Sequence, residues 1–233
     1  MNVIISHDTK DRDFDAAMLA GVTPVRRING RNASKADVLF FDIDGQRVAL
    51  KSYAPRPALI RHTLGRWLIA RESAAYQAAA GAPALPAFLG RVGSFTLATE
   101  WVYAEPLSTR IGTLLDGEIF DRLAVILEDL HHRGVALADL HHRDVLLADD
   151  GSLYLIDLAT AWVLGERPGA LRRNVFERFR ESDLVNLARM RARFTGGDVE
   201  MAAATVSPAA ASRHQRGRGV KSFWDRIRGK DRG

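Results

Sequence analysis

Cysteine is absent from the 233-residue sequence, and its absence excludes disulfide bonds, thiolate catalysis and cysteine-based zinc sites. The seven histidines form no His-Glu-x-x-His pattern, so we expect no zinc site of that kind either. The sequence also lacks an uninterrupted apolar run of the roughly 18 residues that cross a membrane. Its N-terminus lacks the apolar core of a signal peptide. Together these absences favour a cytoplasmic protein.

Most of the chain has almost no net charge. The positive excess is concentrated at the C-terminal end. Arg213 to Gly233 contains eight lysines and arginines against two aspartates, a net charge of +6, whereas the whole chain carries +5. Residues 196–219 are rich in glycine, alanine and serine, which predicts a flexible linker. The apolar residues of 220–233 fall on one helical face, which predicts a basic amphipathic tail.

We expect this tail, through residues 220–230, to make peripheral contact with an anionic membrane. The alternatives are a short helix that docks on the protein's own surface and a disordered tail. Nucleic acid is not an expected partner, because the rest of the chain has no basic excess and contains no nucleic-acid motif.

Three carboxylates in residues 134–160 are the most informative feature of the sequence. Asp139 is followed by Asp144, and then by two short apolar stretches joined by an acidic turn with glycine; the second stretch ends at Asp157. Converging carboxylates repel one another unless cations hold them, and magnesium carrying nucleotide phosphates prefers such oxygen ligands. The pattern therefore predicts a magnesium–nucleotide site. An ordinary hairpin with solvated acidic turns is the alternative.

This segment resembles the catalytic loop and the metal-binding motif of the protein-kinase-like superfamily, which read H-R-D-x-x-x-x-N and D-F-G. The matching letters here are LADLHHRD and DLA. The resemblance implies that Asp139 is the catalytic base and that Asp157 and Asp144 bind magnesium, or manganese, with Asp144 replacing the usual asparagine. Because Ala138 replaces the arginine, we do not expect activation by a phosphorylated loop.

The letters VALK at residues 48–51 match the V-A-I-K strand of the same superfamily. Strand alternation puts Ala49 and Lys51 on one face, where the resemblance implies that Ala49 leaves room for adenine and Lys51 reaches the phosphates. Residues 58–80 have helical spacing, which places Glu72 on the apolar stripe and predicts an ion pair with Lys51. The alternative is that both residues are ordinary surface charges.

The loop that covers the phosphates in kinases is degenerate in this sequence. Its three glycine positions, counted back from Val38, hold Arg31, Ala33 and Ala36. Two of these are small enough for the backbone to approach a phosphate. Other donors in the loop are Asn32, Ser34 and Lys35. The resemblance implies that ATP also contacts Ala49, Val38, Glu100 and Val102, the last two through a hinge segment.

The predicted fold is α+β: a bilobal, protein-kinase-like fold with a small β-rich N-lobe and a minimal helical C-lobe. The expected parts are a lead-in (1–20), the N-lobe (21–103), the C-lobe (104–195), the linker and the tail. One C-lobe helix has an apolar stripe from Ile119 to Leu130 and ends at Gly134. Another is expected to start near Ser182, with Leu184, Leu187 and Phe194 inward.

Asp183 in that second helix has two interpretations. It anchors the catalytic loop from below, as an equivalent residue does in kinases, or it is a first-turn carboxylate favoured by the helix dipole.

The predicted function is ATP- and magnesium-dependent transfer of a phosphoryl group to a hydroxyl acceptor, either a cell-envelope sugar or a protein serine or threonine. Within the superfamily the chain resembles small bacterial RIO-like kinases and lipopolysaccharide-core (Kdo/heptose) kinases. The catalytic residues would be Asp139, Lys51 and Glu72. One alternative is a pseudokinase-like regulatory module that binds nucleotide without phosphotransfer. Another is an aminoglycoside-type small-molecule phosphotransferase.

Overall fold

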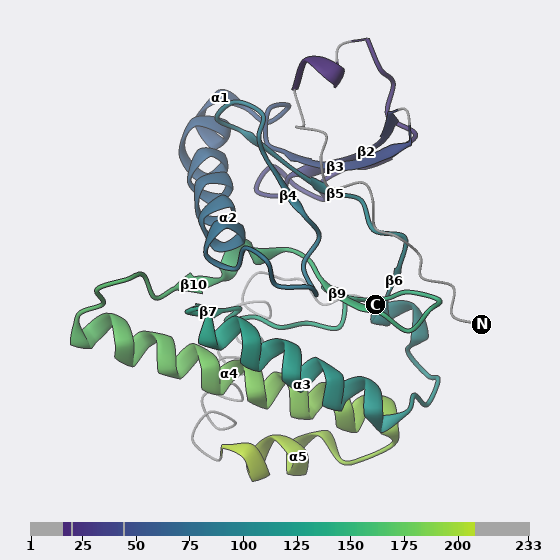
Figure 1. Cartoon of the computed structure of the whole chain (residues 1–233), viewed down its shortest axis with the longest axis vertical. Coiled ribbons are helices and arrows are strands. Elements are labelled where there is room, and N and C mark those ends of the chain that lie inside the picture. Colours follow the sequence, from purple (N-terminus) through teal and green to yellow (C-terminus); the bar gives the residue numbers. More distant parts are fainter. Residues whose placement is uncertain (1–15, 20, 44, 208–233) are drawn as a thin grey trace, which may run out of the picture. The chain divides into compact units, whose positions relative to one another are not determined.

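The computed structural model describes residues 16–19, 21–43 and 45–207. Helices and antiparallel strands both contribute (Figure 1), which confirms the α+β class. The chain forms two compact units. Of the described residues, the first contains those up to Ala104 together with Tyr154–Ala159, and the second contains Glu105–Leu153 and those from Thr160 to Ser207. The sequence did not predict that a segment as late as Tyr154–Ala159 belongs to the first unit.

A five-stranded antiparallel sheet is the main element of the first unit, in the order β1-β2-β3-β5-β4. Its strands are β1 (Arg26–Ile28), β2 (Asp37–Ile43), β3 (Gln46–Ser52), β4 (Phe88–Arg91) and β5 (Thr96–Glu100). Val48 and Leu50 of β3 are buried on one face with Phe41 and Ala98. Because side chains alternate along a strand, Ala49 and Lys51 belong to the opposite face.

The helical segment between β3 and β4 packs on that opposite face of the sheet. It consists of α1 (Ala58–Ile60), a π-helical turn (Arg61–Gly65) and α2 (Arg66–Ala78). Ile69 is fully buried against Tyr53 and Leu97. Gly65 allows this close approach, because a Cβ there would lie 2.7 Å from the Cβ of Tyr53. The contact fixes the face of α2 that carries Glu72.

The second unit is built around α3 (Gly117–His132), which the sequence predicted. Asp116 caps the helix by accepting a hydrogen bond from the Glu118 N–H, and Gly134 follows the helix with φ +75°. The short strands are β6 (Glu105–Pro106), β7 (Val135–Ala136), β8 (Val145–Leu147), β9 (Leu153–Leu155) and β10 (Trp162–Val163). They form a sheet of order β6-β8-β9, whose last strand starts in this unit, and an antiparallel β7–β10 pair.

Helix α4 (Ala170–Thr195) begins well before Ser182, where the sequence analysis placed a helix start. Leu187 and Phe194 are buried as predicted, but Leu184 is 40% exposed, so its inward placement is wrong. The buried face runs through Asp183 and Leu187, and the next residue after Asp183 is rotated by about 100° around the helix. Leu184 therefore lies away from that face.

Helix α5 (Val199–Val206) lies within the stretch predicted as a flexible linker. Asp198 caps it by accepting hydrogen bonds from the N–H groups of Glu200 and Met201. Ala203 is fully buried against Val185 of α4. The alanine-rich composition thus serves helix packing up to Val206. The predicted amphipathic tail lies outside the described residues, and none of the helices within them is long and apolar enough to cross a membrane.

Candidate functional site

Lys51, Glu72 and Asp157 form an ionic cluster within the first unit. The ammonium nitrogen of Lys51 lies 2.8 Å from Glu72 Oε2 and donates a hydrogen bond of 2.7 Å to Asp157 Oδ1. The structure therefore contains the predicted Lys51–Glu72 ion pair. It also brings in Asp157, which is 106 positions from Lys51 in sequence.

One cation shared between two carboxylates sets the electrostatics of this cluster. Burial lowers the pKa of Lys51, but the attraction of Glu72 and Asp157 outweighs it and leaves the pKa raised. Burial raises the pKa of Glu72, and the charge of Lys51 offsets only part of that effect. Burial also acts to raise the pKa of Asp157, but the charge and hydrogen bond of Lys51, with a smaller contribution from Lys35, outweigh burial and leave this pKa lowered.

The two carboxylates differ because their exposure differs. The Glu72 side chain is 3% exposed and that of Asp157 is 47% exposed. Glu72 is the buried anion that holds the Lys51 ammonium group in place. Asp157 keeps its charge at a water-accessible position, where it can meet a ligand.

Asp157 has the geometry of a residue held in place for a ligand. Its backbone is in the left-handed region, with φ +63°. Ala138 is the only other non-glycine residue with positive φ among the described residues. Such strain is uncommon outside glycine and clusters at functional positions. The bonds that the described residues make to the Asp157 carboxylate, from Lys51 and from the Ala159 N–H, go to Oδ1, which leaves Oδ2 for another ligand.

The predicted ATP-contact residues Ala49 and Val38 lie on the same face of the sheet as Lys51. Val38 is directly opposite Lys51 in the β2–β3 pairing, and Phe40 is opposite Ala49. The ring of Phe40 lies 5.1 Å from that of Trp101. Sequence reasoning did not single out this pair, because two aromatic residues so far apart in sequence give no local signal.

Glu100 and Val102 border the end of β5. Glu100 is opposite Val48, so its side chain belongs to the other face of the sheet from Lys51. The Glu100 N–H donates to the Ala87 carbonyl at 2.8 Å, and its carboxylate accepts a bond of 3.3 Å from the Ala87 N–H. The N–H and the carboxylate of Glu100 are thus both bonded to Ala87.

Asp139 and Asp144 lie in the second unit, on the loop between β7 and β8. Asp139 is exposed and Asp144 is half-buried. The Asp144 N–H donates to the His141 carbonyl at 2.9 Å, which closes a turn in the loop. The five residues predicted to be catalytic or to bind magnesium therefore divide between the units: Lys51, Glu72 and Asp157 belong to the first, and Asp139 and Asp144 to the second.

Asp183 anchors this loop from the helix beneath it. It is completely buried, and its Oδ2 accepts a 2.8 Å bond from the Leu137 N–H and lies 3.0 Å from Nε2 of His131. Burial raises the pKa of Asp183, and the bonds from His131 and Leu137 counteract only part of the rise. Because α4 starts at Ala170, Asp183 is not a first-turn carboxylate, which removes that interpretation. His131 was not identified from the sequence.

His141 and His142 are adjacent residues of the same loop. Their rings are 4.0 Å apart, and Nδ1 of His141 accepts bonds from the backbone and side chain of Arg143. Burial, together with the neighbouring His141 and Arg193, lowers the pKa of His142 to about 4. His142 is therefore neutral at physiological pH and contributes packing rather than charge.

No group of three or more histidine, aspartate or glutamate side chains is gathered around a point that could hold a metal ion in the part of the chain described. Of the predicted magnesium ligands, Asp157 is in the first unit and Asp144 in the second. The free Oδ2 of Asp157 and its lowered pKa fit a divalent cation, because such cations prefer ionised oxygen ligands.

No model of a known protein family matches the chain, and no curated protein is significantly similar to it in sequence.

Proposed function

We propose that the protein is an ATP- and magnesium-dependent phosphotransferase that transfers the γ-phosphoryl group to a hydroxyl acceptor. The observation that carries the proposal is the Lys51–Glu72–Asp157 cluster, in which one lysine is held between a buried and an exposed carboxylate. Phosphoryl transfer is catalysed chiefly by positioning and charge neutralisation, and a fixed lysine beside a metal-binding carboxylate suits both tasks.

The proposed fold is the bilobal protein-kinase-like one, with the two units as its lobes. Two features support it: the helix that carries Glu72 lies between β3 and β4, and the segment with Asp157 belongs to the first unit. The anchoring of Leu137 by Asp183 supports a catalytic role for the following loop, because a buried carboxylate restrains the backbone just before Asp139.

Each residue has a distinct role in the proposed reaction. Lys51 donates to phosphate oxygens, and Glu72 holds its ammonium group. Asp157 and Asp144 are the residues that would hold magnesium, which when bound neutralises phosphate charge. Asp139 accepts the proton of the acceptor hydroxyl as the new oxygen–phosphorus bond forms and the bond to the departing ADP breaks. The proposed acceptor is a cell-envelope sugar or a protein serine or threonine.

A nucleotide-binding regulatory module without phosphotransfer is the second candidate. It is favoured by the direct bond between Lys51 and Asp157, which in an active arrangement both bind the nucleotide complex. It is also favoured by the absence of glycine from the three positions where kinases have it in the phosphate loop.

Asp139→Asn separates these two functions. Loss of a positioned general base typically costs 10²–10⁴-fold in rate, so transfer from labelled ATP to a cell-envelope or protein extract should fall by roughly that factor. The thermal shift caused by ATP and magnesium should persist. Asp144→Asn is the matched control: it retains an oxygen ligand and should keep substantial activity. Equal turnover, or none, in wild type and Asp139→Asn while both bind ATP would favour the regulatory module.

ATP binding itself is tested with Lys51→Ala and Asp157→Ala. Each should reduce the increase in melting temperature caused by ATP and magnesium, since a ligand that binds only the native state stabilises it. If wild type shows neither a thermal shift nor calorimetric heat with millimolar ATP and magnesium or manganese, the phosphotransferase proposal fails.

A further inference from the structure

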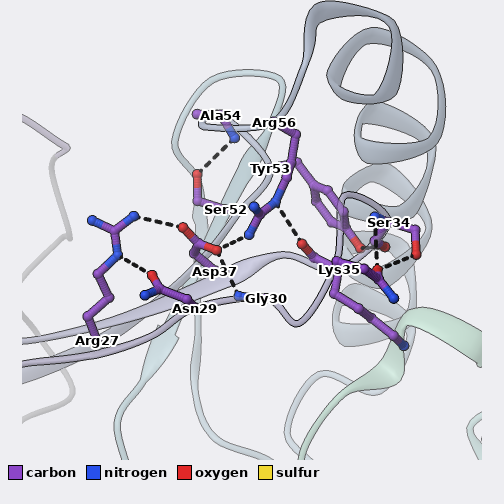
Figure 2. A network of polar contacts seen from close by, with 11 residues as sticks. Arg27, Asn29, Gly30, Ser34, Lys35, Asp37, Ser52, Tyr53, Ala54 and Arg56 are labelled. Carbon is purple, nitrogen blue, oxygen red and sulfur yellow. Dashed lines mark hydrogen bonds and ion pairs between the residues drawn. The ribbon is translucent and has the colours of Figure 1, made fainter.

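The loop between β1 and β2, residues 29–36, is held by a buried carboxylate at its end. Asp37 is 2% exposed, and Figure 2 shows the polar groups gathered around it. Its Oδ2 lies 2.8 Å from Nη2 of Arg27, and its Oδ1 accepts a 2.9 Å bond from the Gly30 N–H. The guanidinium of Arg56 also pairs with Oδ1. These contacts join both ends of the loop to one anion.

Arg56 fixes the far side of the same loop. Besides its ion pair with Asp37, its Nε donates a 2.8 Å bond to the Lys35 carbonyl (Figure 2). Gly30 packs directly under this contact. A Cβ at Gly30 would lie 2.7 Å from the Ala36 carbonyl oxygen and 2.7 Å from Arg56 Nη2. Glycine is therefore needed at this position for close packing, although its backbone φ is not positive.

Backbone N–H groups that a glycine-rich loop would offer to a phosphate are already used inside this loop. The Gly30 N–H bonds to Asp37, the Ser34 N–H bonds to Asn32 Oδ1 at 3.1 Å, and the Lys35 N–H bonds to the Asn32 carbonyl at 3.1 Å. The Ser34 hydroxyl also donates to Asn32 Oδ1, at 2.7 Å. Three of the loop's amides and the Ser34 hydroxyl thus already have partners within the loop or at Asp37. A side-chain cation offers a further means to bind an anion.

Lys35 is the cation that this arrangement presents. Its side chain is exposed and extends away from Asp37 and Arg56 in Figure 2. No ion pair joins it to another residue in the described ranges. The loop that carries Lys35 ends at Asp37, which is opposite Ser52 in the β2–β3 pairing, and the next residue, Val38, is opposite Lys51. The sheet register therefore brings the end of this loop beside Lys51.

We propose that Lys35 binds phosphate groups together with Lys51, and that Asp37 and Arg56 are positioning residues that hold the loop which presents it. A side-chain ammonium thereby replaces the backbone amides of a glycine-rich loop. That the ligand is a nucleoside triphosphate rests on the proposed phosphotransferase function. Its chemical core is the capture of a polyphosphate by two lysines.

The test uses full-length protein and isothermal titration calorimetry with two probes, inorganic tripolyphosphate and ATP with magnesium. Lys35→Gln should weaken both by about 10-fold, the order of one charge-assisted hydrogen bond. Arg91→Gln is the matched control, because Arg91 is also an exposed cation of the first unit but lies on β4 and donates to the Ser94 carbonyl. It should change either affinity by less than about 2-fold.

A double-mutant cycle separates positioning by Arg56 from a merely structural role. Arg56→Gln should weaken tripolyphosphate binding, but the Lys35→Gln/Arg56→Gln protein should bind no more than about 2-fold more weakly than Lys35→Gln alone, because Arg56 acts through Lys35. Circular dichroism at the assay temperature establishes that each variant is folded. Fully additive losses would overturn the positioning role.

The outcomes distinguish this inference from the proposed function. If ATP binds and depends on Lys51, while Lys35→Gln behaves like Arg91→Gln, the inference is overturned and the proposed function is untouched. If tripolyphosphate binding depends on Lys35 but ATP does not bind, the two-lysine anion site stands and the phosphotransferase proposal fails. If wild type binds neither probe, both are overturned.

Discussion

Two clusters in the first unit each bury a carboxylate with equal side-chain exposure, yet they are built in opposite ways. The side chains of Asp37 and Glu72 are each 3% exposed. Asp37 is one anion between two arginines and accepts a backbone N–H as well. Glu72 shares a single lysine with a second carboxylate. The first cluster has a net charge of +1 and the second of −1.

This difference separates a cluster that holds the chain from one that is ready for a ligand. A buried anion with surplus cations and a backbone donor is fully compensated, and it restrains the segments that contact it. A cluster with surplus negative charge and an exposed carboxylate gains from a further cation. Magnesium bound to a nucleotide would supply that cation next to Asp157.

Breaking the Asp37 cluster should have the largest effect on stability. Asp37→Asn leaves Arg27 and Arg56 without their anion and should lower the free energy of unfolding by about 3 kcal/mol. Urea denaturation followed by circular dichroism measures this change. A loss below about 1 kcal/mol would show that the cluster does not hold the loop and the sheet edge.

Breaking the Glu72 cluster should instead affect ligand binding more than stability. Glu72→Gln leaves Lys51 paired with Asp157, so the free energy of unfolding should change by less than about 1 kcal/mol. The affinity for ATP with magnesium should fall by about 10-fold, because Lys51 is no longer held for the phosphates. A stability loss as large as that of Asp37→Asn, measured by the same denaturation, would erase the contrast between the clusters.

The free energy of unfolding should depend on pH through the titration of Glu72. Its pKa is raised above the ordinary value of 4.5, so the folded state binds this proton more tightly than the unfolded state. The contribution of Glu72 is therefore most favourable at low pH and declines as pH rises from about 4.5 through the folded pKa.

Denaturation of wild type and Glu72→Gln between pH 4 and 7 isolates this contribution, and wild type should lose stability relative to the variant as pH rises. Asp157, whose pKa is lowered, acts with the opposite sign but is present in both proteins, and it loses its contribution only as pH falls through its folded pKa. Lys51 stays protonated throughout, since its pKa is raised. A difference that stays constant or reverses would contradict the assignment.

The smallest expected effect lies in the second unit, outside both clusters. Ala138 has φ +67°, and glycine adopts this conformation without the clash of a Cβ. Ala138→Gly should therefore raise the free energy of unfolding by roughly 0.5 kcal/mol, after the greater entropy of glycine in the unfolded chain is allowed for. Thermal denaturation tests this result. A clear destabilisation would mean that the alanine methyl makes contacts worth more than the strain.

Local sequence signals predicted the strand that carries Lys51, the helix that carries Glu72 and the helix before the Asp139 loop. The apolar residues of these elements recur with a regular period, and the elements end at turn residues such as Gly134. Both signals are visible in the local sequence. The start of α4 was misjudged because half of the residues from Leu171 to Arg180 are charged and only Phe176 is buried. Such a helix shows little apolar periodicity at its beginning.

The sequence by itself determined which charged residues lie on which face of their own strand or helix, because alternation along β3 and the helical period of α2 are local properties. It therefore indicated that Glu72 is buried and needs a cation. Only the tertiary structure decided that Asp157 shares that cation and that Asp37 is enclosed by two arginines. Those groupings join segments far apart in sequence, and they depend on chain packing that no local pattern encodes.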